Sequence, residues 1–307
     1  MTGFNRIMKF LSVISGLAAM AGSAIAQITV VNTSSLVSAV ADDPKTAVVS
    51  FNAGASANKL IVQVSAEGQD VDSITYQGVA LTQAAVGAAT GRNRGIFYLD
   101  NPFTGGAADL SVTLGVGISN GISVGVVSVS GAAPGVAAAA VADGASSVTL
   151  TVPVSGSFVV GGYASNGTGT ITLPAGHTAI YNSTNIGSAH AAASYANAQT
   201  AGSKTYSYTD TGSSSPATSA AVFVPASAAP VITGTSPAAG AIAVPPDANL
   251  VATFSEPVVA GSGNIQLWQS GGSSPVESFN VATSPQLSFS GTTLTIDPSA
   301  NLAPNTI

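Results

Sequence analysis

The chain has 307 residues, of which only 7% are charged, and its formal net charge is -6 at pH 7. It contains no cysteine, which excludes disulfides, thiol catalysis, cysteine-held iron–sulfur clusters and cysteine-bound zinc. Because Lys and Arg number only 7, the chain has little with which to displace counterions from a phosphate backbone, and we expect no nucleic-acid partner.

The first 26 residues have the pattern of a secretory signal peptide. Arg6 and Lys9 form a basic start, an apolar run follows, and Ala24–Ala26 provides a small-residue cleavage site. The apolar run is too short for a membrane-spanning helix, and we expect no spanning segment after the signal is removed. The pattern therefore predicts an exported protein, extracellular or at the cell surface, whose mature chain starts at Gln27.

Residues 27–224 are predicted to form one large antiparallel β-sandwich of the jelly-roll kind, which makes the fold class all-β. Short β-rich segments follow one another, separated by Gly, Asn and Pro turns, and many alternate apolar with polar residues. In the segment at 59–66, for example, Leu60, Val62 and Val64 share one face. Such alternation gives each strand an apolar face to bury against a second sheet.

Two places in this domain depart from simple alternation. The segment that begins at Ile122 changes phase after Val126, which predicts a β-bulge near Val126. Residues 132–142 are rich in Ala, but Pro134 and Gly135 favour a loop with at most one turn of helix.

The order of several pieces in this domain is similar to a known pattern. LIVQVSAEG is followed by ITYQGVALTQAA, then by GIFYLDNPFTGGAADLSVTL, and then by a strand rich in Gly, Val and Ser. This order resembles an exported bacterial β-sandwich domain of unknown function. The resemblance implies a sandwich and an exported setting, and it implies no activity.

A second domain is predicted at residues 231–307, after a linker at 225–230 that has Pro at both ends. SPAAGAIAVPPDANLVATFSEPV, GNIQLW and TLTIDPSANLAPNT resemble the bacterial Ig-like domain of the S-layer (SbsA-like) type. The resemblance implies a smaller Ig-like sandwich that serves as a spacer or stalk. In that family another strand follows the last of these segments, so we expect a C-terminally truncated domain that belongs to a longer protein.

Aromatic side chains are the best candidates for ligand binding. Flat amphipathic rings can stack on sugars, although the same side chains also fill sandwich cores. The candidate residues for binding are Tyr163, Tyr181, Tyr206, Tyr208 and Trp268.

The acids and histidines offer weaker sites. Asp70 and Asp72 could supply hard oxygen ligands to calcium, or they could simply form a turn that leads into a strand. The two histidines, His177 and His190, have no spacing typical of a Ser-His-Asp triad. We therefore expect no catalytic residue, no enzyme activity and no cofactor other than a possible calcium ion.

These observations predict an exported, non-catalytic structural or interaction module, adhesin-like or stalk-like, with a surface glycan or a protein as its partner. Two alternatives stay open. The first is a carbohydrate-binding, lectin-like module, with or without calcium, which requires the aromatic candidates to lie on one exposed face. The second is the targeting and spacing region of a larger secreted enzyme.

Overall fold

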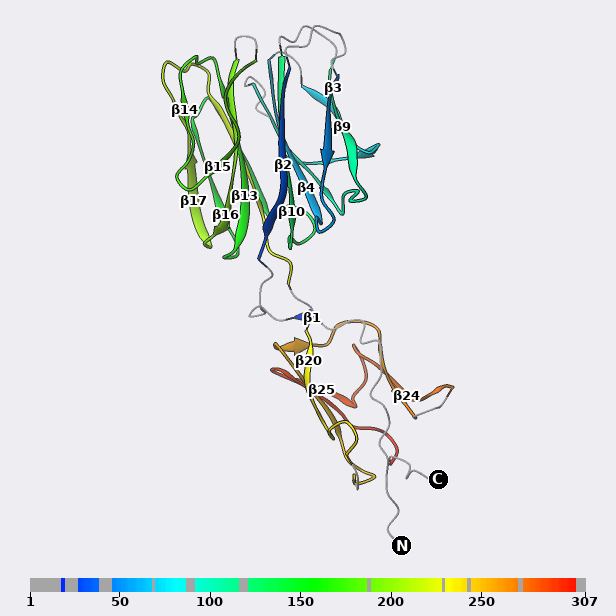
Figure 1. Cartoon of the computed structure of the whole chain (residues 1–307). Helices are drawn as coiled ribbons and strands as arrows, with labels where there is room; N and C mark the ends of the chain where they lie inside the picture. The colour runs from blue at the N-terminus through cyan, green and yellow to red at the C-terminus, as the bar shows by residue number, and fades with distance from the viewer. Residues whose placement is uncertain are drawn as a thin grey trace. The chain divides into compact units, whose positions relative to one another are not determined.

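The computed structural model (Figure 1) describes residues 18–19, 27–38, 46–67, 70–86, 92–115, 121–186, 189–227, 230–241, 244–269 and 273–301. Throughout these ranges every regular element is a β-strand, which confirms the all-β prediction. No helix long and apolar enough to cross a membrane occurs in the described residues. The chain divides into two compact units, Ile25–Ala226 and a second one that contains Ser227–Ile307.

The first half of the large unit is a sandwich of two antiparallel sheets, called here the first sandwich (Figure 1). Its inner sheet has the strand order β2-β10-β4-β8-β7, and its outer sheet has the order β3-β9-β5-β6. The strands are β2 (Thr29–Ser38), β3 (Thr46–Asn52), β4 (Lys59–Glu67), β5 (Val71–Tyr76), β6 (Val79–Ala80), β7 (Thr82–Val86), β8 (Asn93–Asp100), β9 (Ala107–Leu114) and β10 (Gly121–Ser130).

The second half forms another sandwich, the second sandwich. Its inner sheet has the order β11-β19-β13-β16-β15, and two short sheets, β12-β17 and β14-β18, cover the outer face. The strands are β11 (Ala138–Asp143), β12 (Ser147–Val152), β13 (Ser157–Ser165), β14 (Ile171–Thr172), β15 (Thr178–Ile186), β16 (Ala189–Gln199), β17 (Gly202–Ser207), β18 (Thr209–Asp210) and β19 (Ala217–Phe223).

The two inner sheets pack against each other, so each is buried on both faces. On β4, Leu60 and Val62 face the core of the first sandwich, whereas Ile61 joins a separate cluster with Phe158 and Phe223 of the second. This cluster is a third apolar core between the sandwiches. The predicted single sandwich over residues 27–224 is therefore two sandwiches, joined through sheets that have no solvent-facing side.

Burial on both faces also explains the phase change after Val126. Val126 packs in the core of the first sandwich, and Val127 and Val129 pack in the core between the sandwiches. The register of β10 with β4 runs without a shift from Gly121 to Val129, so there is no bulge near Val126 on that side. The only irregularity in β10 lies between Ser128 and Val129, in its pairing with β2.

The two sandwiches repeat one topology. In each inner sheet the first strand of the sandwich lies at the edge and the last strand pairs beside it, as β2 and β10 do in one and β11 and β19 in the other. Positive φ recurs in corresponding places: φ is 85° at Gly54 between β3 and β4 and 86° at Gly156 between β12 and β13, and it is 51° at Asn101 just after β8 and at Ala198 near the end of β16. Across the stack, β2 approaches β15 and β7 approaches β11, as expected for two copies related by an approximate two-fold axis.

The Ala-rich segment contains a strand that was predicted as a loop. Residues 138–143 form β11, which pairs along its whole length with β19. Ala has a low β propensity, but pairing with a fully buried neighbour overrides local preference. The loop prediction holds only for the residues between Gly131 and Ala137.

The C-terminal unit has its own apolar core. Its main sheet has the order β20-β21-β26-β25, the hairpin β23-β24 faces the same core, and the two-residue β1 pairs with β22. Most of the predicted signal peptide and the last residues of the predicted Ig-like domain, 302–307, lie outside the described residues. The strands are β1 (Ala18–Ala19), β20 (Ile232–Ser236), β21 (Leu250–Phe254), β22 (Val258–Val259), β23 (Asn264–Trp268), β24 (Pro275–Asn280), β25 (Leu287–Ser290) and β26 (Thr293–Ile296).

Candidate functional site

The predicted aromatic binding face is not formed, because the four tyrosines are core residues. Tyr163 and Tyr208 are 0% and 2% exposed, and their rings stack with centroids 5.2 Å apart. Tyr206 is buried beside His177, and Tyr181 is buried between the inner sheets. Tyr206 and Tyr208 come from the outer layer and turn inward, and Tyr163 stacks on Tyr208. Tyr181 faces Gln63 of the other inner sheet. Alternation alone could not distinguish these buried faces from a solvent-exposed one.

Trp268, the fifth aromatic candidate, lies in the C-terminal unit, at the end of β23, and is half-buried. It therefore belongs to a different compact unit from the four tyrosines. A continuous exposed face formed by several of these aromatic residues is absent from the described structure.

Asp70 and Asp72 lie at the start of β5 with exposed side chains. The carbonyl of Asp70 accepts a hydrogen bond from the amide of Gly115, which ties this turn to the end of β9. No group of three or more His, Asp or Glu residues that could hold a metal occurs in the described ranges. Calcium binding by Asp70 and Asp72 stays a prediction.

A buried polar network crosses the core between the sandwiches. Gln63 of β4 donates to Ser65 and Asn93, and it accepts a hydrogen bond from the hydroxyl of Tyr181 in the second sandwich. Asn93 in turn donates to the carbonyl of Gly162 at 2.8 Å and to Ser219 at 2.9 Å. Because an unpaired polar group is costly there, this network fixes how the two sheets face each other.

Gly162 is required by this network. A Cβ atom at Gly162 would lie 2.5 Å from the amide nitrogen of Gln63, so only glycine leaves room for the glutamine. Desolvation raises the pKa of the Tyr181 phenol, which keeps it a hydrogen-bond donor at neutral pH.

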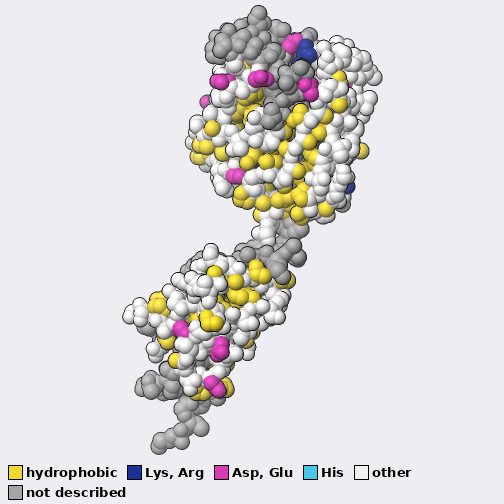
Figure 2. Space-filling view, turned by 180° about the vertical axis from the view of Figure 1, so that it is seen from behind, with side chains coloured by type: hydrophobic (Ala, Val, Ile, Leu, Met, Phe, Trp, Pro, Cys, Tyr) yellow, Lys and Arg dark blue, Asp and Glu magenta, His cyan; other side chains and the backbone are white. Residues whose placement is uncertain are grey.

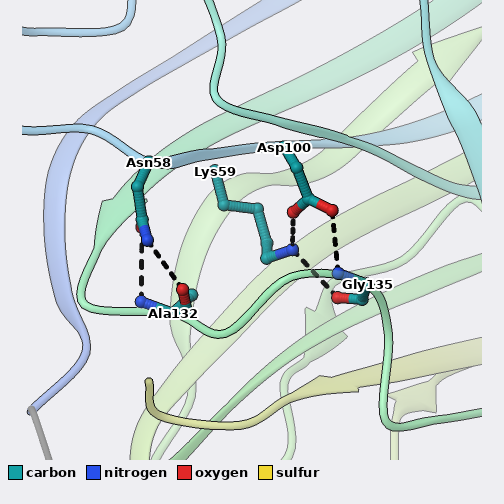
Figure 3. Close-up of polar contacts among 5 residues, drawn as sticks. All are labelled: Asn58, Lys59, Asp100, Ala132 and Gly135. Carbon is teal, nitrogen blue, oxygen red and sulfur yellow. Dashed lines mark hydrogen bonds and ion pairs between the residues drawn. The ribbon is translucent and has the colours of Figure 1, made fainter. Parts of the chain in front are cut away.

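Lys59 is the second polar link between the sandwiches (Figure 3). It is 0% exposed, forms an ion pair with Asp100 across the β4–β8 pair, and donates to the carbonyl of Gly135 at 2.9 Å. Its ammonium also lies 4.9 Å from the ring centre of Tyr98 and 5.3 Å from that of Phe223. Burial lowers the pKa of Lys59, and the hydrogen bond and charge of Asp100 oppose that shift.

The same region holds the connection between the sandwiches. Asp100 accepts from the amide of Gly135 at 2.8 Å, and Asn58 uses both ends of its amide on the backbone of Ala132 (Figure 3). Three side chains of the first sandwich therefore hold the segment that leads into the second. A segment fixed at two points should leave little freedom for one sandwich to move against the other.

Ser165, His190 and Asp210 come together at one end of the second sandwich, and all three are buried. Ser165 donates to Oδ2 of Asp210, and Nδ1 of His190 lies 3.3 Å from the same oxygen. The carboxylate therefore stands between the serine and the histidine. In a catalytic triad the histidine must contact the serine, so this order does not make Ser165 a nucleophile.

His177 takes part in a separate chain of contacts. Its Nδ1 lies 2.9 Å from the hydroxyl of Ser194, which lies 2.8 Å from the hydroxyl of Tyr208. Burial lowers the pKa of His177 from 6.5 to about 4, and burial also raises the pKa of Tyr208. These groups are neutral at physiological pH, so the chain is a core hydrogen-bond network rather than an acid–base pair.

The buried clusters around Lys59, Gln63 and Asp210 are not among the sites predicted from the sequence. Their members come from strands that are distant along the chain, and no short motif connects them. One signal was available: Lys59 and Gln63 break the apolar pattern of a strand that is otherwise suited to burial on both faces. A polar residue at such a position indicates a specific buried partner.

Comparison with known proteins adds a family for the C-terminal part alone. The searches of curated proteins and of solved structures gave no match. The family match does not identify the S-layer (SbsA-like) subtype, which stays a prediction. Residues 226–307 match the family model of the bacterial Ig-like domain, which confirms the prediction of such a domain in this part of the chain.

Proposed function

We propose that this chain is an exported, non-catalytic module of the bacterial surface, in which the double sandwich is a rigid body and the Ig-like unit is a spacer. Bacterial Ig-like domains are common in extracellular and surface proteins, which supports this setting. The observation that carries the proposal is the burial of both inner sheets on both faces. A body built in this way resists bending and presents loops at its ends.

The surface chemistry supports a structural role. On the face drawn in Figure 2, most acidic side chains of the large unit lie toward its upper end, and basic side chains are few. Such a face has no strong charged patch to attract a nucleic acid or an anionic membrane. This surface is compatible with contacts that the loops make to a protein or a glycan. Such a partner is part of what we propose here.

The lectin alternative loses its main support. It needed several aromatic side chains on one exposed face, and four of the five candidates are buried. The buried Ser165, His190 and Asp210 do not support acyl transfer, because the carboxylate stands between the serine and the histidine.

Expression of the full chain in a bacterium, followed by protease treatment of intact cells, tests the proposal. We expect a mature N-terminus at Gln27, a protein accessible from outside, and early cleavage between residues 224 and 231 that leaves the large unit intact. An uncleaved protein retained in the cytoplasm would refute the export part. Stepwise digestion of the large unit, without a stable fragment, would refute the rigid-body part.

A further inference from the structure

A tight turn folds over a buried carboxylate at one end of the second sandwich. The turn runs from Ser165 to Gly167, and the carboxylate belongs to Asp210, the last residue of β18. Ser165 donates to Oδ2 of Asp210 and accepts from the amide of Gly167 at 2.8 Å. A Cβ atom on Gly167 would lie 2.2 Å from Oδ2 and 2.7 Å from Oδ1, so the glycine backbone lies directly on the carboxylate.

Two oxygen atoms at this turn are buried acceptors without a donor. Among the described residues, Oδ1 of Asp210 and Oδ1 of Asn166 have no hydrogen-bond partner. Asp210 is 8% exposed, and its second oxygen is already used by Ser165 and His190. Asn166 stands between the two residues that contact the carboxylate. Buried oxygens of this kind are nearly always satisfied by a donor, a water or a cation.

We propose that Asp210 and Asn166 bind a calcium ion at this end of the second sandwich. A carboxylate oxygen and an amide oxygen are hard ligands of the kind that Ca²⁺ prefers, and flexible oxygen coordination suits a site completed by hydroxyls, carbonyls and water. The segment after Asp210 lies beside this turn, because the amide of Asn166 donates to the carbonyl of Ser214 at 3.0 Å. The ion would also neutralise a buried negative charge.

The expected affinity follows from the ligand charge. With one carboxylate the site belongs to the weak class of extracellular calcium modules, with a Kd of about 10⁻⁴ to 10⁻³ M. Such a site would fill outside the cell, where the proposed function places the chain. The binding claim itself does not depend on that setting, because it can be measured on purified protein.

Terbium luminescence on the full chain is the first test, because Tb³⁺ replaces Ca²⁺ and a nearby tyrosine can excite it. Tyr208 lies two residues before Asp210 and would serve as the donor. We expect a saturable Tb³⁺ signal that Ca²⁺ displaces, that Asp210→Asn removes, and that the paired variant Asp70→Asn with Asp72→Asn leaves unchanged. A signal that is lost only in the paired variant would overturn the proposal and favour calcium at the start of β5.

Asn166→Asp gives a test that does not rely on loss of folding. It adds a second carboxylate at the site, so Ca²⁺ should bind at least about tenfold more tightly than to the natural chain. Ca²⁺ at ten times Kd should also raise Tm of the natural chain by about 3 °C, with no rise in Asp210→Asn. If Ca²⁺ leaves Tm unchanged and Asn166→Asp does not strengthen binding, a buried water satisfies these oxygens and the proposal is wrong.

Discussion

Removing the carboxylate of Asp100 tests the link that holds the two sandwiches together. In Asp100→Ala the ammonium of Lys59 stays fully buried and loses its only described carboxylate partner. Breaking a buried ion pair from one side costs about 3–5 kcal/mol. The side chain of Asp100 is 28% exposed, and Gly135 and two aromatic rings still contact the ammonium, so we expect a loss of about 2–3 kcal/mol.

Lys59→Met gives the matched comparison. It removes the buried charge and keeps most of the volume, and Asp100 remains partly solvated with the Gly135 amide as a donor. The free energy of unfolding should then fall by less than about 1 kcal/mol. The double variant should cost little more than Lys59→Met alone, because no ammonium is left without a partner. Asp109→Asn, on an exposed position of β9, should change stability by less than about 0.5 kcal/mol.

The assay can separate the two units of the chain. All 7 tyrosines lie in the large unit, and the single tryptophan, Trp268, lies in the Ig-like unit. Urea unfolding followed by the near-UV tyrosine signal therefore reports on the double sandwich, and Trp fluorescence reports on the spacer. If Asp100→Ala costs less than about 0.5 kcal/mol, or if Lys59→Met costs as much as Asp100→Ala, the reasoning about this link is refuted.

Three further predictions concern the core, the pH response and export. Gly162→Ala should lower the free energy of unfolding by about 1–3 kcal/mol, because the added methyl group meets the Gln63 amide. The control Gly115→Ala, whose added methyl group would have its nearest atom at 3.8 Å, should lower it less. Urea unfolding midpoints of the two variants give the comparison. The pKa of His177 is about 4 in the folded state and 6.5 unfolded, so stability should fall by up to about 3 kcal/mol as pH drops from 6.5 to 4. A flat Tm profile in that range would contradict this, and His177→Gln should flatten it. Mass spectrometry of secreted protein should show Gln27 as the first residue, and a retained leader would contradict the signal peptide.

Strand positions could be predicted from the sequence because they follow from local alternation and turn residues. The segment predicted at 59–66, for example, forms β4 at Lys59–Glu67. The Ig-like domain was predictable from a family pattern. Strand β11 (Ala138–Asp143) lies where a loop is predicted, and it forms because the edge of the buried strand β19 is available to pair with it.

The duplication and the buried clusters were not predictable, for a common physical reason. The two sandwiches share a topology but not their core chemistry: β4 places Gln63 in the central interface, and the facing strand β13 places Gly162 there to make room. Complementary partners differ in residue type, so the repeat is not visible as a repeated sequence. The sequence left the tyrosines open between a binding face and the core, because alternation shows which face a residue shares and not whether another sheet covers that face.

The most direct test of the central claim is hydrogen exchange, measured by mass spectrometry across a urea series, for β4 and β13. These strands lie in the inner sheets of different sandwiches and face each other across the shared core. If the double sandwich is one rigid body, their amides should lose protection at the same urea concentration and with the same free energy. Two separate midpoints, one for each sandwich, would show that the sandwiches unfold independently and would contradict the account.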